Sequence, residues 1–265
     1  MPTTNRRSFL AWAAAGLAAG CSRLGAWKRQ PIHILQITDM HILDEASMAY
    51  SQSVVQAMNV ETGDFALVTG DLATSGLRDE LVRAKRVLDG LDMPYYVVPG
   101  NHDAQHAGDR DEPVFREVFG LESTNYHFAV QGLRCIALDP GCGTDYLNNA
   151  VRPDALAWLG AELAAMPREE PILLFTHYPY GPGVPYETTN AAEVLALFAD
   201  RNLLGVVSGH FHGNTERTPD GILMTTTACS SSTRTNHDGT EAKGFRVFHI
   251  GEDLSVRTEF RTVPA

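Results

Sequence analysis

The stretch Tyr95-Tyr96-Val97-Val98-Pro99-Gly100-Asn101-His102-Asp103 places an apolar run directly before a cluster of polar side chains. Aromatic and β-branched residues bounded by Pro and Gly are typical of a buried strand. Asn101, His102 and Asp103 would then lie at the C-terminal end of that strand. The stretch therefore predicts a sheet that carries chemically active side chains along one edge.

The same arrangement recurs four more times along the chain. Further apolar runs are Ile32–Thr38, Phe65–Thr69, Ile172–Phe175 and Leu203–Ser208. The polar motifs that follow them are Asp39-Met40-His41, Gly70-Asp71, Thr176-His177 and Gly209-His210-Phe211-His212. The C-terminal ends of neighbouring strands meet at one edge of an open α/β sheet, so we expect these motifs to converge. The resulting crevice would hold three Asp, one Asn and five His.

Such a crevice is typical of a metal centre, because unpartnered polar groups are costly to bury and metal ions would use them all. Mixed imidazole and carboxylate ligands suit Fe, Mn or Zn, and the sequence leaves the choice among these metals open. Two ions roughly 3.5–4 Å apart need a bridging anion, for which Asp71 is the best candidate.

The chemistry of such a centre points to phosphoester hydrolysis. Two bound metals lower the pKa of water from 15.7 toward about 7, and the resulting metal-bound hydroxide can attack phosphorus in line. The leaving alkoxide needs a proton, and His102 is placed beside Asn101 to supply it. We therefore expect a binuclear phosphoesterase.

On these motifs, the chain from about Ile32 to its C-terminus resembles the calcineurin-like metallophosphoesterase superfamily. The resemblance implies a four-layer α/β/β/α sandwich, with two central mixed β-sheets flanked by helices. It implies a first metal held by Asp39, His41, Asp71 and His212. It implies a second metal held by Asp71, Asn101, His177 and His210, with Asp71 bridging. His102 would be the acid or transition-state donor, oriented by a hydrogen bond that Asp103 accepts from it.

Departures from subfamily patterns narrow the expected substrate. Purple acid phosphatases carry Tyr three residues after the bridging Asp, where this chain has Thr74. Lipid A pathway pyrophosphatases carry Arg in place of His102. The spacing is most similar to the cyclic-nucleotide and glycerophosphodiester phosphodiesterase group, which favours a small phosphodiester substrate. The alternatives are a phosphomonoesterase with the same site and a non-catalytic exported metal-binding or scaffold protein, although an intact His102 argues against the latter.

Hydrophobic periodicity and Gly or Pro punctuation predict the other elements of a single domain over residues 31–265. The expected helices are Ser47–Val60, Arg78–Asp89, Pro153–Met166 and Asn190–Arg201. A hairpin is expected over Tyr126–Val130 and Leu133–Leu138, and later strands over Ile222–Thr226, Phe245–Ile250 and Leu254–Phe260.

The N-terminus reads as an export signal over residues 1–20, followed by a linker over 21–30. Arg6-Arg7 followed by Phe9-Leu10 and a short apolar stretch resembles a twin-arginine signal, which would engage the twin-arginine export machinery. An ordinary secretory signal is the alternative. Leu17-Ala18-Ala19-Gly20-Cys21 also resembles a lipoprotein box, or else an ordinary cleavage site near a Cys. We expect a periplasmic protein or a lipoprotein anchored to the membrane through Cys21.

The charge of the chain bears on its partners. The formal net charge is −11, and removal of Arg6 and Arg7 with the signal makes it −13. A nucleic-acid polymer would require a basic track, so we expect a small phosphoester as substrate. The oligomeric state stays open.

Three further features leave alternatives open. Cys135, Cys142 and Cys229 would form one disulfide or none. Tyr178, Tyr180 and Tyr186 would either stack on a substrate or pack their own loop. The stretch Ser230–Thr240, which contains His237, would be either a substrate lid or an exposed connection.

Overall fold

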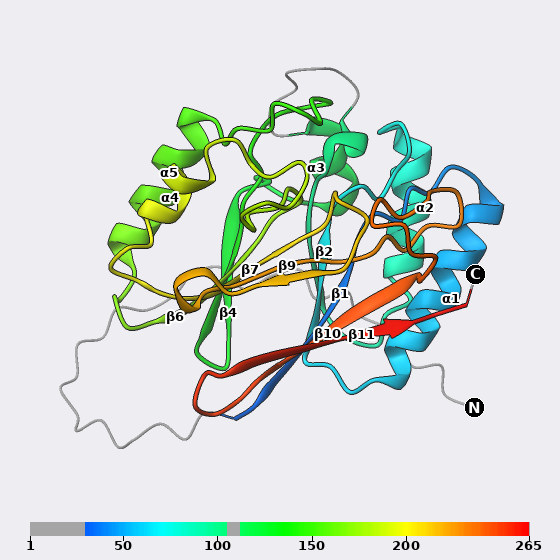
Figure 1. Ribbon diagram of the computed structural model, residues 1–265. Coiled ribbons are helices and arrows are strands. Elements are labelled where there is room, and N and C mark those ends of the chain that lie inside the picture. Colours follow the sequence, from blue (N-terminus) through cyan, green and yellow to red (C-terminus); the bar gives the residue numbers. More distant parts are fainter. Residues whose placement is uncertain (1–29, 105–111, 265) are drawn as a thin grey trace, which may run out of the picture.

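Two β-sheets, with helices on their outer faces, make up the computed structural model, which describes residues 30–104 and 112–264 (Figure 1). The predicted export signal, Cys21 and nearly all of the predicted linker lie outside the described residues. Within the described residues, no helix is both long and apolar enough to span a membrane. The four-layer α/β/β/α sandwich expected from the sequence is confirmed.

The first sheet has the strand order β11-β10-β1-β2-β3. Its three parallel strands are β1, β2 and β3, and β10 joins β1 in the antiparallel sense. The bounds are β1 Ile32–Ile37, β2 Phe65–Thr69, β3 Tyr95–Val98, β10 Gly244–Ile250 and β11 Val256–Thr262.

The second sheet has the order β4-β5-β6-β7-β9-β8. Strands β5, β6, β7 and β9 run parallel, and β4 and β8 are antiparallel edge strands. The bounds are β4 Tyr126–Val130, β5 Leu133–Ala137, β6 Pro171–Phe175, β7 Asn202–Ser208, β8 Thr215–Arg217 and β9 Leu223–Thr226.

Helices cover both outer faces, as Figure 1 shows. The first sheet packs against α1 Glu45–Val60, α2 Arg78–Leu88 and α3 Pro113–Phe119. The second sheet packs against α4 Pro153–Ala165 and α5 Ala191–Ala196. Two short 3₁₀ helices complete the described elements, η1 Asn101–Asp103 and η2 Pro219–Gly221.

The alternation of side chains along each strand divides the core into three layers. In β1, Leu35 and Ile37 pack against the helices, whereas Ile34 faces the second sheet. Phe175 of the second sheet belongs to that same inter-sheet cluster, and its neighbour Leu174 packs against α4 and α5. Both faces of each central strand are therefore buried, which explains why these strands read as continuous apolar runs.

A buried polar network joins the two sheets close to their strand ends. Nε2 of Gln36 in β1 donates to Oγ1 of Thr69 at 2.8 Å and to the carbonyl oxygen of Ser208 in β7 at 3.0 Å. Oε1 of Gln36 accepts from Oγ1 of Thr227 at 2.6 Å, and Thr227 in turn accepts from Nε of Arg246. The network fixes the sheets relative to each other where the motifs begin.

Apart from shifts of one or two residues at the ends of elements, the main differences from the predicted elements are as follows. Helix α5 ends at Ala196 rather than Arg201, because the chain tightens into i to i−3 hydrogen bonds such as Phe198 N to Leu195 O. The last strand begins at Val256, since Leu254 lies in a turn with a φ of 67°. The short α3 and β8 were not predicted.

The three described cysteines are free, so they form no disulfide with one another. Cys135 and Cys229 are buried, and Cys142 is half-buried. Burial raises the pKa of the Cys142 thiol to about 12. This thiol therefore stays protonated at neutral pH, which makes it a poor nucleophile and metal ligand.

Candidate metal centre

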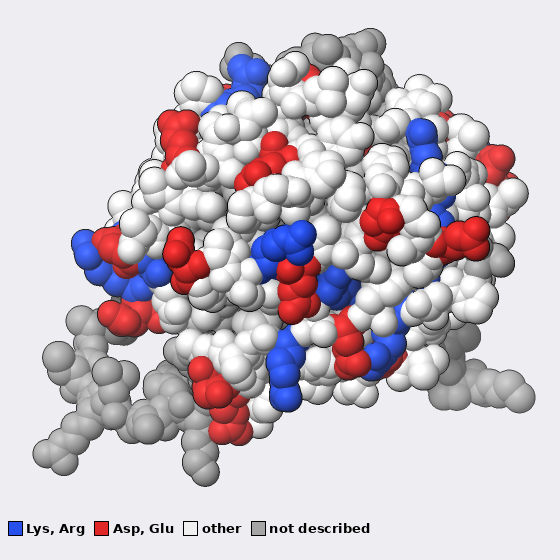
Figure 2. All heavy atoms as spheres, viewed as in Figure 1, with Lys and Arg blue, Asp and Glu red and all other residues white. Residues whose placement is uncertain are grey.

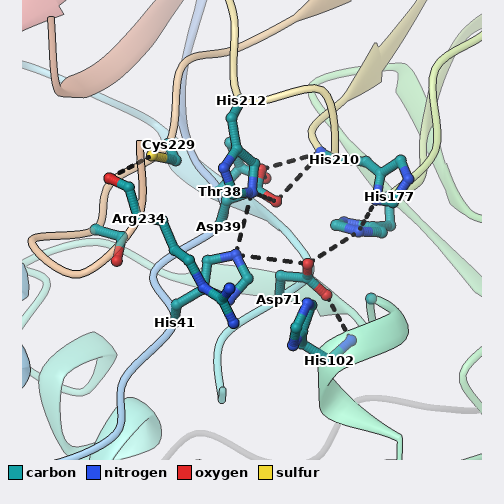
Figure 3. A network of polar contacts seen from close by, with 12 residues as sticks. Thr38, Asp39, His41, Asp71, His102, His177, His210, His212, Cys229 and Arg234 are labelled. Atoms are coloured by element: carbon teal, nitrogen blue, oxygen red, sulfur yellow. Dashed lines mark hydrogen bonds and ion pairs between the residues drawn. The ribbon is translucent and has the colours of Figure 1, made fainter. Parts of the chain in front are cut away.

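The five motifs meet in one crevice between the C-terminal strand ends of both sheets (Figure 3). The first sheet supplies Asp39 and His41 after β1, Asp71 after β2, and Asn101 in η1 after β3. The second sheet supplies His177 after β6, and His210 and His212 after β7. All seven predicted ligands are buried. The structure therefore brings together every residue that the sequence nominated as a metal ligand.

One set of side chains converges on the space between Asp39 and Asp71. Nε2 of His212 lies 3.1 Å from Oδ1 of Asp39 and 3.1 Å from Nε2 of His41. Nε2 of His41 lies 3.6 Å from Oδ2 of Asp71. Four ligand atoms of these residues all lie within 4.8 Å of one another. This spacing can hold one metal ion.

A second set shares Asp71 with the first. Nε2 of His177 lies 3.4 Å from Oδ2 of Asp71 and 3.1 Å from Nδ1 of His210. Oδ1 of Asn101 lies 3.3 Å from the same His177 nitrogen. Figure 3 shows His41 and His177 on opposite sides of Asp71, each with its ring nitrogen directed toward the carboxylate. The arrangement suits a carboxylate that bridges two ions.

The hydrogen bonds that His177 and His210 make outside the crevice show whether a cation would fit between their rings. Nδ1 of His177 donates to the carbonyl oxygen of Thr69 at 2.8 Å, and Nε2 of His210 donates to that of Tyr146 at 3.2 Å. In the neutral rings, the two remaining nitrogens present lone pairs that face each other across 3.1 Å. A shared cation satisfies both, and carbonyl partners of this kind are typical of metal-bound histidines.

The pKa shifts of the crevice residues also favour a bound cation. Burial alone would raise the pKa of Asp39, but the adjacent His212 outweighs it and the pKa is lowered. For Asp71, burial is likewise outweighed by His177, and the pKa lies well below its ordinary value. Burial opposes charge on His177 and His212, yet the two carboxylates raise their pKa values to about 9 and about 11. The metal-free crevice thus holds protons where ions would otherwise sit.

The ligands have a backbone conformation that the sequence did not reveal. Five of them have positive φ, a left-handed conformation that is uncommon for residues other than Gly. They are Asp39 at 53°, His41 at 46°, Asp71 at 53°, His210 at 64° and His212 at 50°. Each such residue stores backbone strain, and strained residues of this kind cluster at functional sites.

At two motif positions only glycine fits, because other side chains lie directly against the backbone. A Cβ on Gly100 would collide with the Asp71 side chain and lie 2.8 Å from Cε1 of His177. A Cβ on Gly209 would collide with Oγ1 of Thr38. These glycines therefore let backbone and ligands crowd into the same crevice.

The structure places His102 at the site and corrects the expected role of Asp103. Among the described residues, Nδ1 of the half-buried His102 bonds to the carbonyl oxygen of Thr74 at 2.7 Å, not to Asp103. The Asp103 carboxylate instead accepts from the backbone N–H groups of Ala73 at 2.8 Å and Gly100 at 2.9 Å. The tight turn of η1 directs this side chain back to its own cap, so Asp103 holds the loop rather than the ring.

A cavity of about 290 Å³ opens over the centre. Besides motif residues, its lining includes five residues from later loops, which are Tyr146, Tyr186, Arg234, Thr235 and His237. Tyr146 was not predicted, because a single residue in an irregular loop leaves no pattern in a sequence. Arg234 and Thr235 lie in the stretch Ser230–Thr240 that was considered as a lid, but they were not named individually. The loop around His237 does reach the site.

Of the three tyrosines considered, only one lines the cavity. Tyr178 and Tyr180 are buried, and the Tyr178 hydroxyl donates to the carbonyl oxygen of Asp145 at 2.8 Å. Packing is therefore the right interpretation for these two. Tyr186 is 37 % exposed, and its ring centroid lies 5.3 Å from that of His210.

Comparison with known proteins agrees with this geometry. The sequence profile of the calcineurin-like phosphoesterase family matches residues 32–214, a span that contains all five motifs. The chain belongs to this family. The matched span contains both ligand sets and the carboxylate of Asp71 that lies between them.

Curated relatives of the family carry phosphodiesterase names. The chain is 26% identical over 258 residues to a 3′,5′-cyclic-nucleotide phosphodiesterase of Nostoc, covering 89% of this chain and 94% of the relative. It is 25% identical over 220 residues to a probable glycerophosphodiester phosphodiesterase of Arcobacter nitrofigilis, covering 75% of this chain and 78% of the relative. The chain is thus a hydrolase that acts on phosphoric ester bonds.

Solved structures share the fold at low identity. A dimetal phosphatase from Danio rerio superposes with a TM-score of 0.65 at 16% identity, over 86% of this chain and 98% of that one. A purple acid phosphatase from yellow lupin also reaches 0.65 at 13% identity, over 88% of this chain and 52% of that one. These likenesses establish the two-sheet architecture alone.

Proposed function

We propose that this enzyme hydrolyses small phosphodiesters at a two-metal centre bridged by Asp71. One observation carries the proposal. Oδ2 of Asp71 lies 3.6 Å from Nε2 of His41 and 3.4 Å from Nε2 of His177, so a single carboxylate oxygen faces both ligand sets.

The residues divide between the two ions as follows. Asp39, His41 and His212 would complete one set with Asp71, and Asn101, His177 and His210 would complete the other. Bound Fe, Mn or Zn supplies a water-derived nucleophile at neutral pH and offsets the phosphoryl charge. The carbonyl oxygens of Thr69 and Tyr146 orient the rings of His177 and His210 for that purpose.

His102 is the proton donor in this proposal. Its Nδ1 is engaged by Thr74, and its backbone N–H donates to Asp71, so the residue is fixed at the edge of the cavity. With the Nδ1–H committed to the Thr74 carbonyl, Nε2 carries a proton when the ring is an imidazolium, and it is that proton which passes to the leaving alkoxide and leaves the ring neutral.

Room for a second ester group favours diesters over monoesters. The cavity extends beyond the ligands to Tyr146 and Tyr186, which leaves space for an organic substituent beside the phosphoryl group. The phosphodiesterase names of the relatives support the same substrate class.

Charge supports a small substrate over a nucleic-acid polymer. The chain carries a net charge of −11. On the face drawn in Figure 2, acidic and basic side chains are interspersed, and the basic ones form no continuous track. A polymer backbone would be held weakly by such a surface.

We also propose that the enzyme works after export. The Arg6-Arg7 signal and the apolar stretch Ala11–Gly20 support delivery by the twin-arginine route, and Cys21 would be the site of a lipid anchor. This route carries folded proteins, so the metals could be loaded first.

The test is hydrolysis by the mature protein, from residue 21 with Cys21→Ser, stripped of metal and reloaded with Mn, Fe or Zn. The panel holds an aryl phosphodiester, an aryl phosphomonoester and a cyclic nucleotide. Metal-dependent turnover of diesters well above that of the monoester is expected. Monoester preference would overturn the substrate class, and no turnover with two metals bound would favour a scaffold protein.

A further inference from the structure

We propose that the guanidinium of Arg234 binds the phosphoryl group of the substrate and that Lys243 holds Arg234 in position. This inference rests on the proposed function, because it assigns a phosphate to the cavity above the two ligand sets. It adds a charged residue from outside the five motifs to that site.

The first observation is that the Arg234 side chain is half-buried and that no described residue is its partner. Among residues 30–104 and 112–264, no carboxylate lies within ion-pair distance of its guanidinium, and no acceptor takes its hydrogen bonds. Other half-buried or buried arginines are engaged, as Arg134 is by Glu170 and Arg246 by Thr258. Arg234 therefore keeps five donors free for a ligand.

The second observation is where this free group lies. Arg234 lines the same cavity as His41 and His102. Figure 3 shows its side chain extending from its loop toward these two histidines. Of the described residues that line the cavity, Asp71 is the one acid, so an anion that enters meets a guanidinium whose N–H donors have no described acceptor. Phosphoryl oxygens match the fork of these donors, and such charge-assisted hydrogen bonds are among the strongest in proteins.

The third observation is that the loop 227–243 is preorganised from both sides. Nζ of Lys243 donates to the carbonyl oxygen of Arg234 at 2.6 Å and to Oδ1 of Asn236 at 3.3 Å. The next carbonyl, that of Thr235, accepts from Nδ1 of His212 at 3.1 Å. The backbone that carries Arg234 is thus tied to the ligand His212 on one side and to Lys243 on the other. Preorganisation of this kind lowers the entropic cost of binding.

The test measures binding of inorganic phosphate by isothermal titration calorimetry, with metal content determined on the same samples. The variants are Arg234→Ala and Arg234→Lys in the metal-loaded mature protein. Arg257→Ala on β11 is the matched control, because it removes the same charge away from the cavity. We expect Arg234→Ala to weaken phosphate binding about 10- to 100-fold, with two metals still bound. The phosphate affinity of Arg234→Lys should lie between those of wild type and Arg234→Ala, since Lys keeps the charge but loses the paired N–H donors.

Lys243→Met tests the positioning role, because Met keeps the apolar stem and loses the donors. Phosphate binding should weaken roughly tenfold, and Lys243→Arg should restore part of it. A purely structural role would lower thermal stability and leave the phosphate affinity unchanged. That result would overturn the role of Lys243.

The outcome separates this inference from the proposed function. Equal phosphate affinity in wild type and Arg234→Ala would overturn the inference, even if diesters are hydrolysed. An Arg234-dependent phosphate affinity would support it, even if no ester in the panel is turned over. Kinetics add a second readout, because Arg234→Ala should lower kcat/KM about 100-fold while Arg257→Ala leaves it unchanged.

Discussion

The backbone N–H of His102 donates a hydrogen bond of 2.8 Å to Oδ1 of Asp71, the carboxylate whose other oxygen faces both ligand sets. The bridging group therefore also fixes the residue that we expect to protonate the leaving group. In the proposed mechanism, one side chain would therefore link metal binding to proton transfer.

This coupling makes Asp71 the most sensitive position. Asp71→Asn should lose most of both metals and lower turnover about a thousandfold or more, because the amide removes the anion that both ions share. Elemental analysis of the purified variant measures the loss. Asp89→Asn, a change at the exposed C-terminal cap of α2, is the control and should keep two metals. A full metal content in Asp71→Asn would contradict the bridge.

His41→Ala should separate the two sets. His41 belongs only to the set with Asp39 and His212, so His177, His210 and Asn101 stay in place around Asp71. We expect about one metal per chain instead of two. Loss of both ions together would mean that the sets do not bind independently.

His102→Ala should keep both metals and lower kcat about 10²- to 10⁴-fold. The loss should shrink for esters of acidic alcohols such as p-nitrophenol, because their leaving groups need no proton. His127→Ala on β4 serves as control, since that residue pairs with Glu162 away from the cavity. A loss that is the same for all leaving groups would argue against proton donation by His102.

Tyr186→Ala should raise KM for aryl and nucleoside diesters about 5- to 50-fold, because stacking on the ring is lost. Small aliphatic diesters should be affected little, and Tyr186→Phe should behave like wild type. Steady-state kinetics on a matched series of aryl, nucleoside and aliphatic diesters measures these changes in KM. An equal effect on all esters would show that the ring packs the loop and does not contact substrate.

The metal-free protein should be most stable near pH 6.5. The pKa values of His177 and His212 are raised to about 9 and about 11, so their stabilisation is present below pH 6.5 and is lost as the pH rises through those values. The pKa values of His41 and His210 are lowered to about 3, mainly by burial, so these residues cost stability as the pH falls below 6.5.

Thermal unfolding at pH 5, 6.5 and 9 checks this expectation. Bound metal should raise Tm at pH 9 more than at pH 6.5, because metal replaces the protons that the crevice otherwise needs. A Tm of the metal-free protein that does not change between pH 5 and pH 9 would contradict the assigned charges.

Strands and ligands could be predicted from the sequence because both obey short-range rules. Apolar runs such as Phe65–Thr69 end at a glycine and a polar motif, and their bounds match the structure. The C-terminal edge of parallel strands then brings the motifs together. The predicted role of Asp103 was wrong because the direction of its side chain depends on the local turn of η1, which composition does not encode.

The individual loop residues of the cavity could not be predicted from the sequence, for a different reason. Tyr146 and Arg234 have no periodic neighbours, and their positions depend on contacts with residues far along the chain, such as Arg234 with Lys243 and Tyr146 with His210. The positive φ values of the ligands are likewise imposed by tertiary packing, since local propensity favours other conformations for Asp and His.

The ligands come from both sheets, and His41 and His212 are separated by 171 positions in the chain. Neither metal can be fully coordinated until the two sheets have docked, which is the slowest kind of contact for a folding chain to make. A chain in which only the first sheet has formed would offer three of the four ligands of one set and two of the four of the other, and would hold metal weakly. A chain that binds its metals tightly must therefore have completed its folding.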